Sequence, residues 1–304
     1  MRSRAVVMRK TGGPSVLVIE EVEARSLQDG EIRIRALASA VNHSDLQIRA
    51  GNWTILRAPQ FPYVPGLEVV GEVVEVARDV KQIHEGDRVW TMMQGLGGVR
   101  AERDGGYAEY VVASASAVAL LPANLDPIAF AAVGLAGVTA YQGLVKLGAL
   151  AGKTLAVTGP MGGVGSVAVL LARGAKANVV TVHRDSPPLP AASVDAVLDV
   201  VAGARFAELV TSLRHGGRYC IVGATAGGDV RFDAWTLLNA VTLTGYSTED
   251  IDGDGLRAAT AALLEARLPS PTYTVLPLAE AARAHALLES RAVKGRIVLN
   301  PVEP

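Results

Sequence analysis

The segment that most constrains the fold runs from Thr154 to Arg184. An apolar, β-branched run over 154–158 predicts a buried strand, and a glycine-rich turn follows it. A helix is expected over 166–172 and a second strand over 178–182. The order strand, glycine turn, helix, strand predicts the first unit of a fold that binds a dinucleotide.

The glycine turn has the chemistry that a cofactor pyrophosphate requires. Glycines let an anion approach the backbone, and a helix start offers unpaired N–H groups and the positive end of its dipole. In the pattern G-x-G-x-x-G, Gly162 and Gly165 fill the second and third places, whereas Pro160 stands at the first. A tight turn without a ligand is the alternative, and the complete flanking elements favour the binding interpretation.

Length, charge and cysteine content narrow the class of protein. A chain of 304 residues favours two domains. A net charge of −1 gives no basic field for nucleic acid and no polybasic signal for a membrane surface. The single cysteine, Cys220, excludes a disulfide framework and indicates a reducing, cytoplasmic setting. The uncharged stretch 127–145 contains glycines and a glutamine, and predicts a buried helix pair, or one helix and a loop, rather than a membrane span.

The pattern of the chain changes near residue 122. Alternation and turn residues predict β structure before it, with strands at 5–8, 16–22, 31–41, 69–76, 88–92 and 105–112. Helices and strands alternate from about 127 to 270, and strands return at 273–276 and 295–300 around a helix over 278–290. We therefore expect one β domain built from 1–122 and 271–304, with a nucleotide-binding domain of 123–270 inserted into it.

The inserted domain is predicted to be a shortened, doubly wound parallel sheet. Further strands are expected at 194–199, 218–223 and 241–246, with a helix over 204–214 that His215-Gly216-Gly217 would cap. Only about a dozen residues join the strands 178–182 and 194–199, and Pro187, Pro188 and Pro190 among them forbid a helix. The sheet should therefore lack its third strand and flanking helices, leaving an edge that is open or covered by a partner.

The chain resembles a known family in motifs spread over nearly its full length. They are VNHSDLQIRAG (41–51), FPYVPGLEVVGEVVEV (61–76), EGDRVW (85–90), GGYAEYVV (105–112), GLAGVTAYQGL (134–144), the glycine turn, LRHGGRYCIVG (213–223) and KGRIVLNP (294–301). The chain is similar to the medium-chain dehydrogenase/reductases, in their zinc-independent quinone oxidoreductase and enoyl reductase branch. The resemblance implies a GroES-like β domain plus a Rossmann domain, with the active site in the cleft between them.

The same resemblance bears on zinc. In the zinc alcohol dehydrogenases of the superfamily, the stretch matching VNHSD carries a ligand cysteine and GLE reads GHE. Here Asn42 and Leu67 stand at these places, and neither an amide nor leucine is a good zinc ligand. One cysteine cannot supply the four that the family's structural zinc lobe needs. We expect no metal, with an adventitious ion at His43 and Asp45 as the alternative.

Cofactor choice is predicted at the end of the strand 178–182. Acceptors of ribose hydroxyls in NAD-binding folds are usually Asp or Glu, whereas this chain has His183 and Arg184, followed by Asp185. A guanidinium matches the geometry of the NADPH 2′-phosphate, which favours NADPH. The alternative is that Arg184 is a solvated loop cation. By resemblance, the family's phosphate-binding lysine lies in the helix that this chain lacks.

Position relative to the family motifs implies the other contacts. Cofactor contacts are expected from Asn42, Thr139, Gly162, Gly163, Val164, Gly223 and Asn300, in addition to His183 and Arg184. Asn42 and Tyr63 are the catalytic candidates: Asn42 could bind the nicotinamide ribose or substrate, or cap a local N–H, and Tyr63 could bind the substrate carbonyl or simply pack. Trp53, Ile55, Tyr63 and Trp235 are candidates for lining a substrate pocket, or for core and surface cover.

Without a Lewis acid, hydride addition to a quinone or an enone is favoured over alcohol oxidation, because conjugation spreads the developing charge. The expected function is an NADPH-dependent reductase of such small molecules. The alternatives are a biosynthetic, polyketide-type reductase or cyclase, and a degenerate member that serves as a scaffold. Family members commonly dimerise through the last Rossmann strand, here near 241–246, so a homodimer is expected.

Overall fold

The computed structural model describes residues 2–53, 61–93, 95–96 and 103–302. The chain divides into two compact units. The first contains residues 1–135, 249–260 and 269–304, and the second contains residues 136–248 and 261–268.

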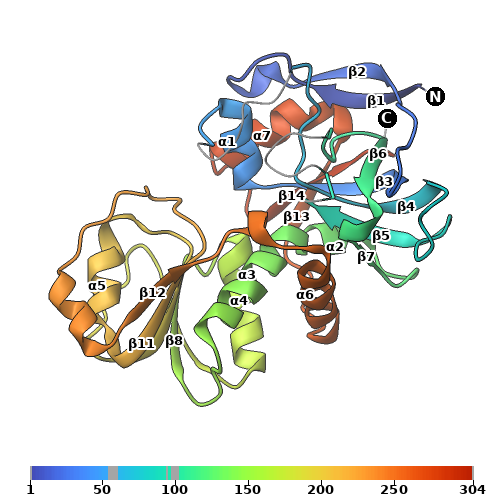
Figure 1. Ribbon diagram of the computed structural model, residues 1–304. Coiled ribbons are helices and arrows are strands. Elements are labelled where there is room, and N and C mark those ends of the chain that lie inside the picture. Colours follow the sequence, from blue (N-terminus) through green and yellow to red (C-terminus); the bar gives the residue numbers. More distant parts are fainter. Residues whose placement is uncertain (1, 54–60, 94, 97–102, 303–304) are drawn as a thin grey trace. The chain divides into compact units, whose positions relative to one another are not determined.

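The first unit is built around a sheet of seven strands (Figure 1). Its strands are β3 (Glu31–Val41), β4 (Glu68–Val76), β5 (Arg88–Met92), β6 (Tyr110–Ser114), β7 (Val118–Leu120), β13 (Tyr273–Pro277) and β14 (Arg296–Asn300). The order is β13-β14-β3-β4-β5-β7, and β6 pairs with β3. β1 (Arg2–Val7) and β2 (Val18–Glu23) form a separate antiparallel pair. The short η1 (Pro14–Val16) lies between them in the sequence. Alternate residues of the long strands, such as Ile32 and Ile34, are fully buried.

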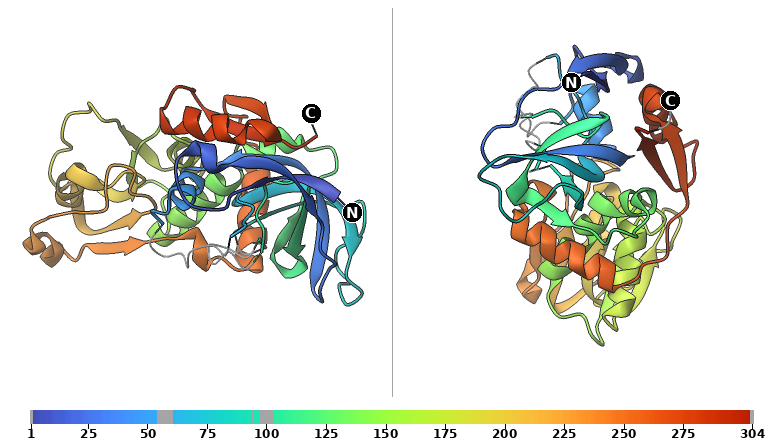
Figure 2. Two further views of the ribbon diagram at one scale, coloured as in Figure 1. Left: turned by 90° about the horizontal axis from the view of Figure 1, so that it is seen from above. Right: turned by 90° about the vertical axis from the view of Figure 1, so that its right-hand side faces the viewer.

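The C-terminal segment completes the N-terminal sheet, as the strand pattern predicts. β14 pairs antiparallel with β3, with Leu299 opposite Ser39, and β13 pairs parallel with β14. The red C-terminal elements therefore lie beside the blue N-terminal ones in Figure 2. Short helices complete this part of the chain: α1 (His43–Ala50), η3 (Ala115–Ala117), α2 (Pro127–Ala131), η6 (Thr248–Asp250), η7 (Leu278–Glu280) and α7 (Ala281–Glu289).

The second unit contains a parallel sheet of five strands in the order β12-β11-β10-β8-β9. They are β8 (Thr154–Thr158), β9 (Asn178–Val182), β10 (Val194–Asp199), β11 (Leu213–Ile221) and β12 (Thr242–Gly245). Helix α4 (Gly163–Gly174) lies on one face of the sheet and α5 (Phe206–Thr211) on the other (Figure 1). The 3₁₀ helices η4 (Gly203–Arg205) and η5 (Ala234–Asn239) belong to loops of this unit.

The predicted shortening of the sheet is confirmed. Residues 183–193, all of which the structure describes, join β9 to β10 without a helix or a strand. β9 consequently forms one edge of the sheet and β12 the other. The three prolines in this connection lack the backbone N–H that a helix needs, and each disfavours the helical conformation in the residue before it.

The structure differs from the prediction around His215-Gly216-Gly217, which does not cap a helix. α5 ends at Thr211, and β11 already begins at Leu213. Val194 pairs with Leu213 but Ala196 pairs with Arg218, so 214–217 bulge out of the β10–β11 ladder. Gly216 has φ of +74°, which favours glycine in this bulge.

The uncharged stretch 127–145 forms a helix pair, as expected. It contains α2 and the start of α3 (Gly134–Leu147). Another long helix, α6 (Gly253–Glu265), follows β12 and η6 in the sequence. Among the described residues, none of the helices combines the length and apolarity needed to cross a membrane.

Candidate active-site residues

The glycine turn between β8 and α4 has a backbone that suits a phosphate group. Gly159 adopts φ of +57°, and its N–H donates to the carbonyl of Val182 at 3.2 Å, which joins the turn to the end of β9. A Cβ on Gly165 would stand 2.2 Å from the carbonyl oxygen of Gly159, so only glycine lets α4 begin this close to the turn. A Cβ on Gly162 would meet only that oxygen, at 3.4 Å.

The space beside Gly162 lies at the start of a twelve-residue helix, whose first N–H groups have no helical carbonyl to bind. Gly163 and Val164, the next two residues, are half-buried. The turn therefore fits the pyrophosphate of a dinucleotide, with backbone N–H donors and the dipole of α4 as the attractive groups.

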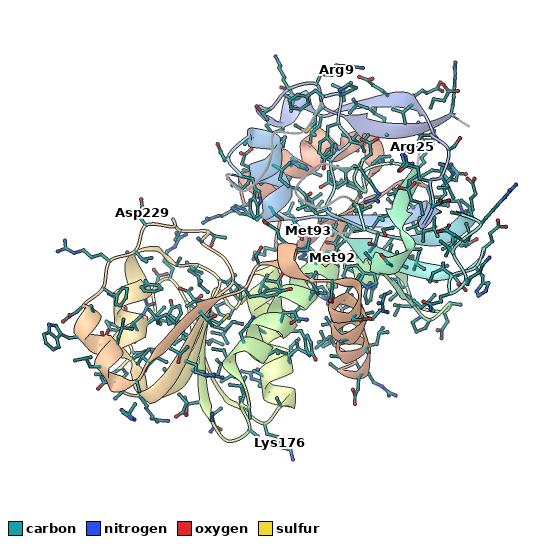
Figure 3. The ribbon with its side chains drawn as sticks, viewed as in Figure 1. Arg9, Arg25, Met92, Met93, Lys176 and Asp229 are labelled. Carbon is teal, nitrogen blue, oxygen red and sulfur yellow. The ribbon has the colours of Figure 1, made fainter. Side chains whose placement is uncertain are left out.

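The other predicted contacts of the second unit lie at strand ends or on α3. His183 and Arg184 follow β9 directly and are exposed. Gly223 follows β11, and a Cβ there would stand 2.8 Å from the carbonyl oxygen of Val200. Thr139 is buried on α3. In Figure 3, Lys176 lies before β9 and Asp229 after β11, at opposite ends of the sheet.

A buried aspartate that no motif in the sequence predicts fixes the end of β10. Asp199 Oδ1 accepts hydrogen bonds from Thr158 Oγ1 at 2.6 Å and from the N–H groups of Val201 and Ala202 at 2.9 and 3.0 Å. Its Oδ2 accepts from the hydroxyl of Tyr219. The carboxylate thus holds the ends of β8, β10 and β11 together. The signal in the sequence was a charged residue closing the apolar strand VDAVLD.

In the first unit, Asn42 lies at the centre of a buried polar network. It precedes α1 and is 4% exposed. Its Nδ2 donates to Glu68 Oε1 at 2.8 Å, and its Oδ1 accepts from Arg296 Nη2 at 2.6 Å. The amide therefore lies between a carboxylate and a guanidinium, and both ends of the side chain have protein partners.

Glu68 and Asp45 are the two buried carboxyl groups of this network. Glu68 Oε2 accepts from the N–H of Leu135 at 2.9 Å. Asp45 accepts from the N–H groups of Asn42 and Leu67, at 2.8 and 3.0 Å. Burial raises the pKa of Asp45 to about 7, opposed by these hydrogen bonds. Burial also raises the pKa of Glu68, opposed chiefly by the positive charge of Arg296.

These residues do not fit a zinc ion. Asn42 is hydrogen-bonded on both sides, Leu67 has no donor atom, and Glu68 accepts from two protein groups. Within residues 2–53, 61–93, 95–96 and 103–302, no group of three or more His, Cys, Asp or Glu side chains is placed to hold a metal.

The remaining predicted residues occupy different environments. Tyr63 is 5% exposed and its backbone pairs with Met8; burial and the charges of Asp45 and Asp104 raise the pKa of its phenol. Trp53 Nε1 donates to Glu249 Oε1 at 3.0 Å. Ile55 lies outside the described residues.

Asn300 and Trp235 complete the predicted set. The Oδ1 of Asn300, at the end of β14, accepts from the N–H of Val302 at 3.0 Å. Trp235 lies on η5 and is 76% exposed. The structure thus gathers Asn42, Tyr63, Trp53 and Asn300 in the first unit, and the glycine turn, Thr139, His183, Arg184, Gly223 and Trp235 in the second.

A buried histidine extends the network of the first unit. His285 on α7 is fully buried, and its Nε2 lies 3.2 Å from the hydroxyl of Tyr107. Burial and, to a lesser extent, the charge of Arg49 lower the pKa of His285 to about 3. The fold therefore holds a neutral imidazole.

This imidazole makes stability depend on pH. Between about pH 3 and 6.5, His285 is protonated in the unfolded chain but neutral in the folded chain. The stability that the buried neutral imidazole contributes is therefore present in full above pH 6.5 and is lost as the pH falls toward 3. The stability difference between wild type and His285→Gln is expected to shrink by about 1.4 kcal/mol per unit as pH falls from 6 to 4. Urea denaturation at several pH values measures this stability difference. The raised pKa of Asp45 also makes stability depend on pH, but it does so equally in both proteins and cancels from the difference. Exposed His215→Gln is the control, and a difference independent of pH would contradict the prediction.

Comparison with known proteins agrees with this architecture. The family model of the alcohol dehydrogenase GroES-like domain matches residues 28–123, and that of the zinc-binding dehydrogenase matches residues 176–299. The quinone oxidoreductase of Sus scrofa is 30% identical, over 97% of each chain. An alcohol dehydrogenase of Geobacillus stearothermophilus is 34% identical, over 75% of this chain and 80% of its own. The solved structure of an NAD-dependent alcohol dehydrogenase, 28% identical, superposes with a TM-score of 0.81 and covers 98% of this chain and 99% of its own.

A GroES-like β unit combined with a parallel, Rossmann-like sheet defines an oxidoreductase of the dehydrogenase class. The chain belongs to the medium-chain dehydrogenase/reductase superfamily, whose dehydrogenases use nicotinamide cofactors. Its homologues act on small molecules.

Proposed function

We propose that this protein is a zinc-independent, NADPH-dependent reductase of quinones or α,β-unsaturated carbonyl compounds. One observation carries the proposal: Asn42, at the place of a zinc ligand in the resemblance, is bound between Glu68 and Arg296. The chain's own guanidinium thus supplies positive charge beside the buried carboxylate.

Reduction of a conjugated acceptor suits such a site. A bound nicotinamide cofactor would supply a hydride to the β-carbon of an enone or to a quinone ring, and a proton from water would complete the reduced product. The charge that develops is spread over the substrate, so the protein needs to orient the acceptor and exclude water rather than supply a Lewis acid.

Tyr63 is the proposed hydrogen-bond donor to the substrate carbonyl. Its phenol, whose pKa burial raises above the ordinary value, is protonated at neutral pH and can donate a hydrogen bond. Asn42 is the proposed second polar group, toward the nicotinamide ribose or substrate, which would share the Oδ1 acceptor with Arg296. Trp53, Ile55 and Trp235 are proposed to supply apolar lining.

NADPH is the proposed cofactor because Arg184 is exposed and makes no hydrogen bond or ion pair with any described residue. Gly162, Gly163 and Val164 would hold the pyrophosphate, and Thr139, Gly223, Asn300 and His183 would complete the contacts. A charge-assisted bond to the 2′-phosphate is worth about 1.5–3 kcal/mol, or roughly 10- to 150-fold in affinity.

The shortened sheet favours a second candidate, a degenerate member that binds a partner without turnover. A biosynthetic, polyketide-type reductase or cyclase is the alternative among enzymes. Titration of the purified protein with NADPH and NADH, followed by nicotinamide fluorescence, tests whether the protein is a reductase or a scaffold. Binding of neither nucleotide would overturn the reductase and favour the scaffold.

A panel of substrates tests which class of compound the protein reduces and whether it needs zinc. Oxidation of NADPH is expected with quinones or simple enones and not with saturated ketones, and elemental analysis is expected to find less than about one-tenth of a zinc ion per chain. Turnover of acyl thioesters alone would favour the biosynthetic alternative. Turnover that requires added zinc would contradict the proposal.

We also propose a homodimer that pairs β12 with its copy. β12 is an edge strand, and Leu238 on the neighbouring η5 is 71% exposed. Leu238→Glu is expected to weaken self-association at least about tenfold, because the charge would be buried between copies. Analytical ultracentrifugation measures this, with Val18→Glu, at an exposed apolar position of the first unit, as the control. A monomeric wild type would exclude the dimer.

A further inference from the structure

The connection that replaces the missing strand and helix is held in a defined conformation. At its start, the N–H of His183 donates to Ser186 Oγ at 2.9 Å, and the N–H of Ser186 donates back to the His183 carbonyl at 3.2 Å. Further along, Leu189 packs against the hydrophobic core of the second unit. Residues 183–189 therefore form an anchored turn rather than a free linker.

Two charged side chains of the segment after β10 anchor this turn. Arg205 Nη1 donates to the carbonyl of His183 at 2.8 Å, and Nη2 donates to that of Pro187 at 3.3 Å. Glu208 Oε1 accepts from the N–H of Leu189 at 3.0 Å. The backbone of the connection is thus bound at three points on either side of Arg184.

Arg205 and Glu208 also bind each other in a two-point ion pair. Arg205 Nη2 lies 2.6 Å from Glu208 Oε1, and Nε lies 3.2 Å from Oε2. The hydrogen bond from Arg205 lowers the pKa of Glu208, so the pair stays ionised at neutral pH. Each side chain is about three-quarters buried, and a bidentate pair of this kind restricts the guanidinium to one plane.

The anchored turn places Arg184 at the sheet edge where a cofactor ribose would lie. The Gly159 N–H binds the carbonyl of Val182, so the glycine turn and the end of β9 are in direct contact, two residues before Arg184. A dinucleotide whose pyrophosphate lies on this turn presents its adenosine ribose toward the end of β9.

We propose that Arg205, supported by Glu208, is a positioning residue that holds the 183–189 turn so that Arg184 can bind a 2′-phosphate. This rests on the proposed NADPH-dependent function. The pair takes over the support that the absent strand and helix would give, and the guanidinium of Arg184 remains the group that contacts the phosphate. Selection of the phosphorylated nucleotide thus depends on two side chains that do not touch it.

Calorimetric titration with two probes, 2′,5′-ADP and 5′-AMP, tests this without catalysis, because the probes differ only by the 2′-phosphate. Wild type is expected to prefer 2′,5′-ADP roughly 10- to 150-fold. Arg205→Ala is expected to reduce this preference to less than about threefold, with 5′-AMP affinity changed less than about threefold. Arg184→Ala should have the same effect, and adding Arg205→Ala to it should change nothing further.

Two further variants sharpen the result. Glu208→Gln keeps an acceptor for Leu189 but removes the ion pair, and is expected to lose part of the preference; it carries the test if Arg205→Ala fails to fold. Arg214→Ala removes another ion pair of the same unit, with Asp195, and should leave the preference unchanged.

The outcomes separate this inference from the function on which it rests. A wild type that binds neither NADPH nor NADH overturns the proposed function. A wild type that prefers 2′,5′-ADP, with Arg205→Ala keeping that preference, overturns only the role of Arg205. A further loss in the Arg184→Ala background would show that Arg205 contacts the phosphate itself, and would also overturn the positioning role.

Discussion

Replacing Arg296 with methionine is expected to lower the free energy of unfolding by about 3 kcal/mol, because it removes the positive charge that most opposes the raised pKa of the fully buried Glu68. Arg296 also donates to Asn42 Oδ1 and, at 3.1 Å, to the carbonyl of Ala132, so these acceptors would lose their donor. Urea denaturation of both proteins at neutral pH measures the difference.

A double-mutant cycle with Glu68→Gln separates the charge from the packing. The double variant should be more stable than the sum of the single effects predicts, by about 1–3 kcal/mol, because no uncompensated charge remains. Arg35→Met is the matched control: its ion pair with Glu72 is partly exposed, and its loss should cost at most about 1 kcal/mol. An Arg296→Met loss as small as that of the control would contradict the expectation that the buried Glu68 depends on the charge of Arg296.

Replacing Gly165 with alanine is expected to cost about 3 kcal/mol, because the new Cβ would stand 2.2 Å from one backbone oxygen and 3.0 Å from another. These are the carbonyl oxygens of Gly159 and Thr158, and neither can move without displacing the turn. Thermal or urea denaturation should show the loss.

Gly162→Ala separates the fold of the turn from its proposed ligand. Its Cβ has room, at 3.4 Å from the carbonyl oxygen of Gly159, so the stability should change by about 1 kcal/mol or less. The methyl group would lie where the pyrophosphate is proposed to approach, and NADPH affinity should fall at least about tenfold. Gly174→Ala, in open space at the other end of α4, should leave affinity unchanged. Unchanged affinity in Gly162→Ala would place the nucleotide elsewhere.

Much of the fold could be predicted from local patterns. β8, β9 and β10 have the predicted bounds, because each is a short apolar run between turn residues. The failure at His215-Gly216-Gly217 is also physical: a glycine pair suits a helix cap and a strand bulge equally well, and the pairing of β10 with β11 selects the bulge.

The candidate site was predictable only in part. The absence of a ligand cysteine and histidine at Asn42 and Leu67 could be seen directly in the sequence. That Arg296 reaches Asn42 could not, because 254 positions separate them and only the pairing of β14 with β3 brings the two segments together. The role of Arg205 and Glu208 could not be predicted either, because their contacts with His183 and Leu189 form only when the chain is folded.

The sequence by itself determined most of the strands and the helix after the glycine turn, because strand, turn and helix preferences act over a few residues, and three prolines between β9 and β10 were enough to remove a helix. Only the tertiary structure decided which polar side chains are buried together. Burial sets the pKa of Asp45 and His285, and long-range pairing gives Glu68 and the turn of Arg184 their partners. These contacts depend on residues far apart along the chain, and no local pattern encodes them.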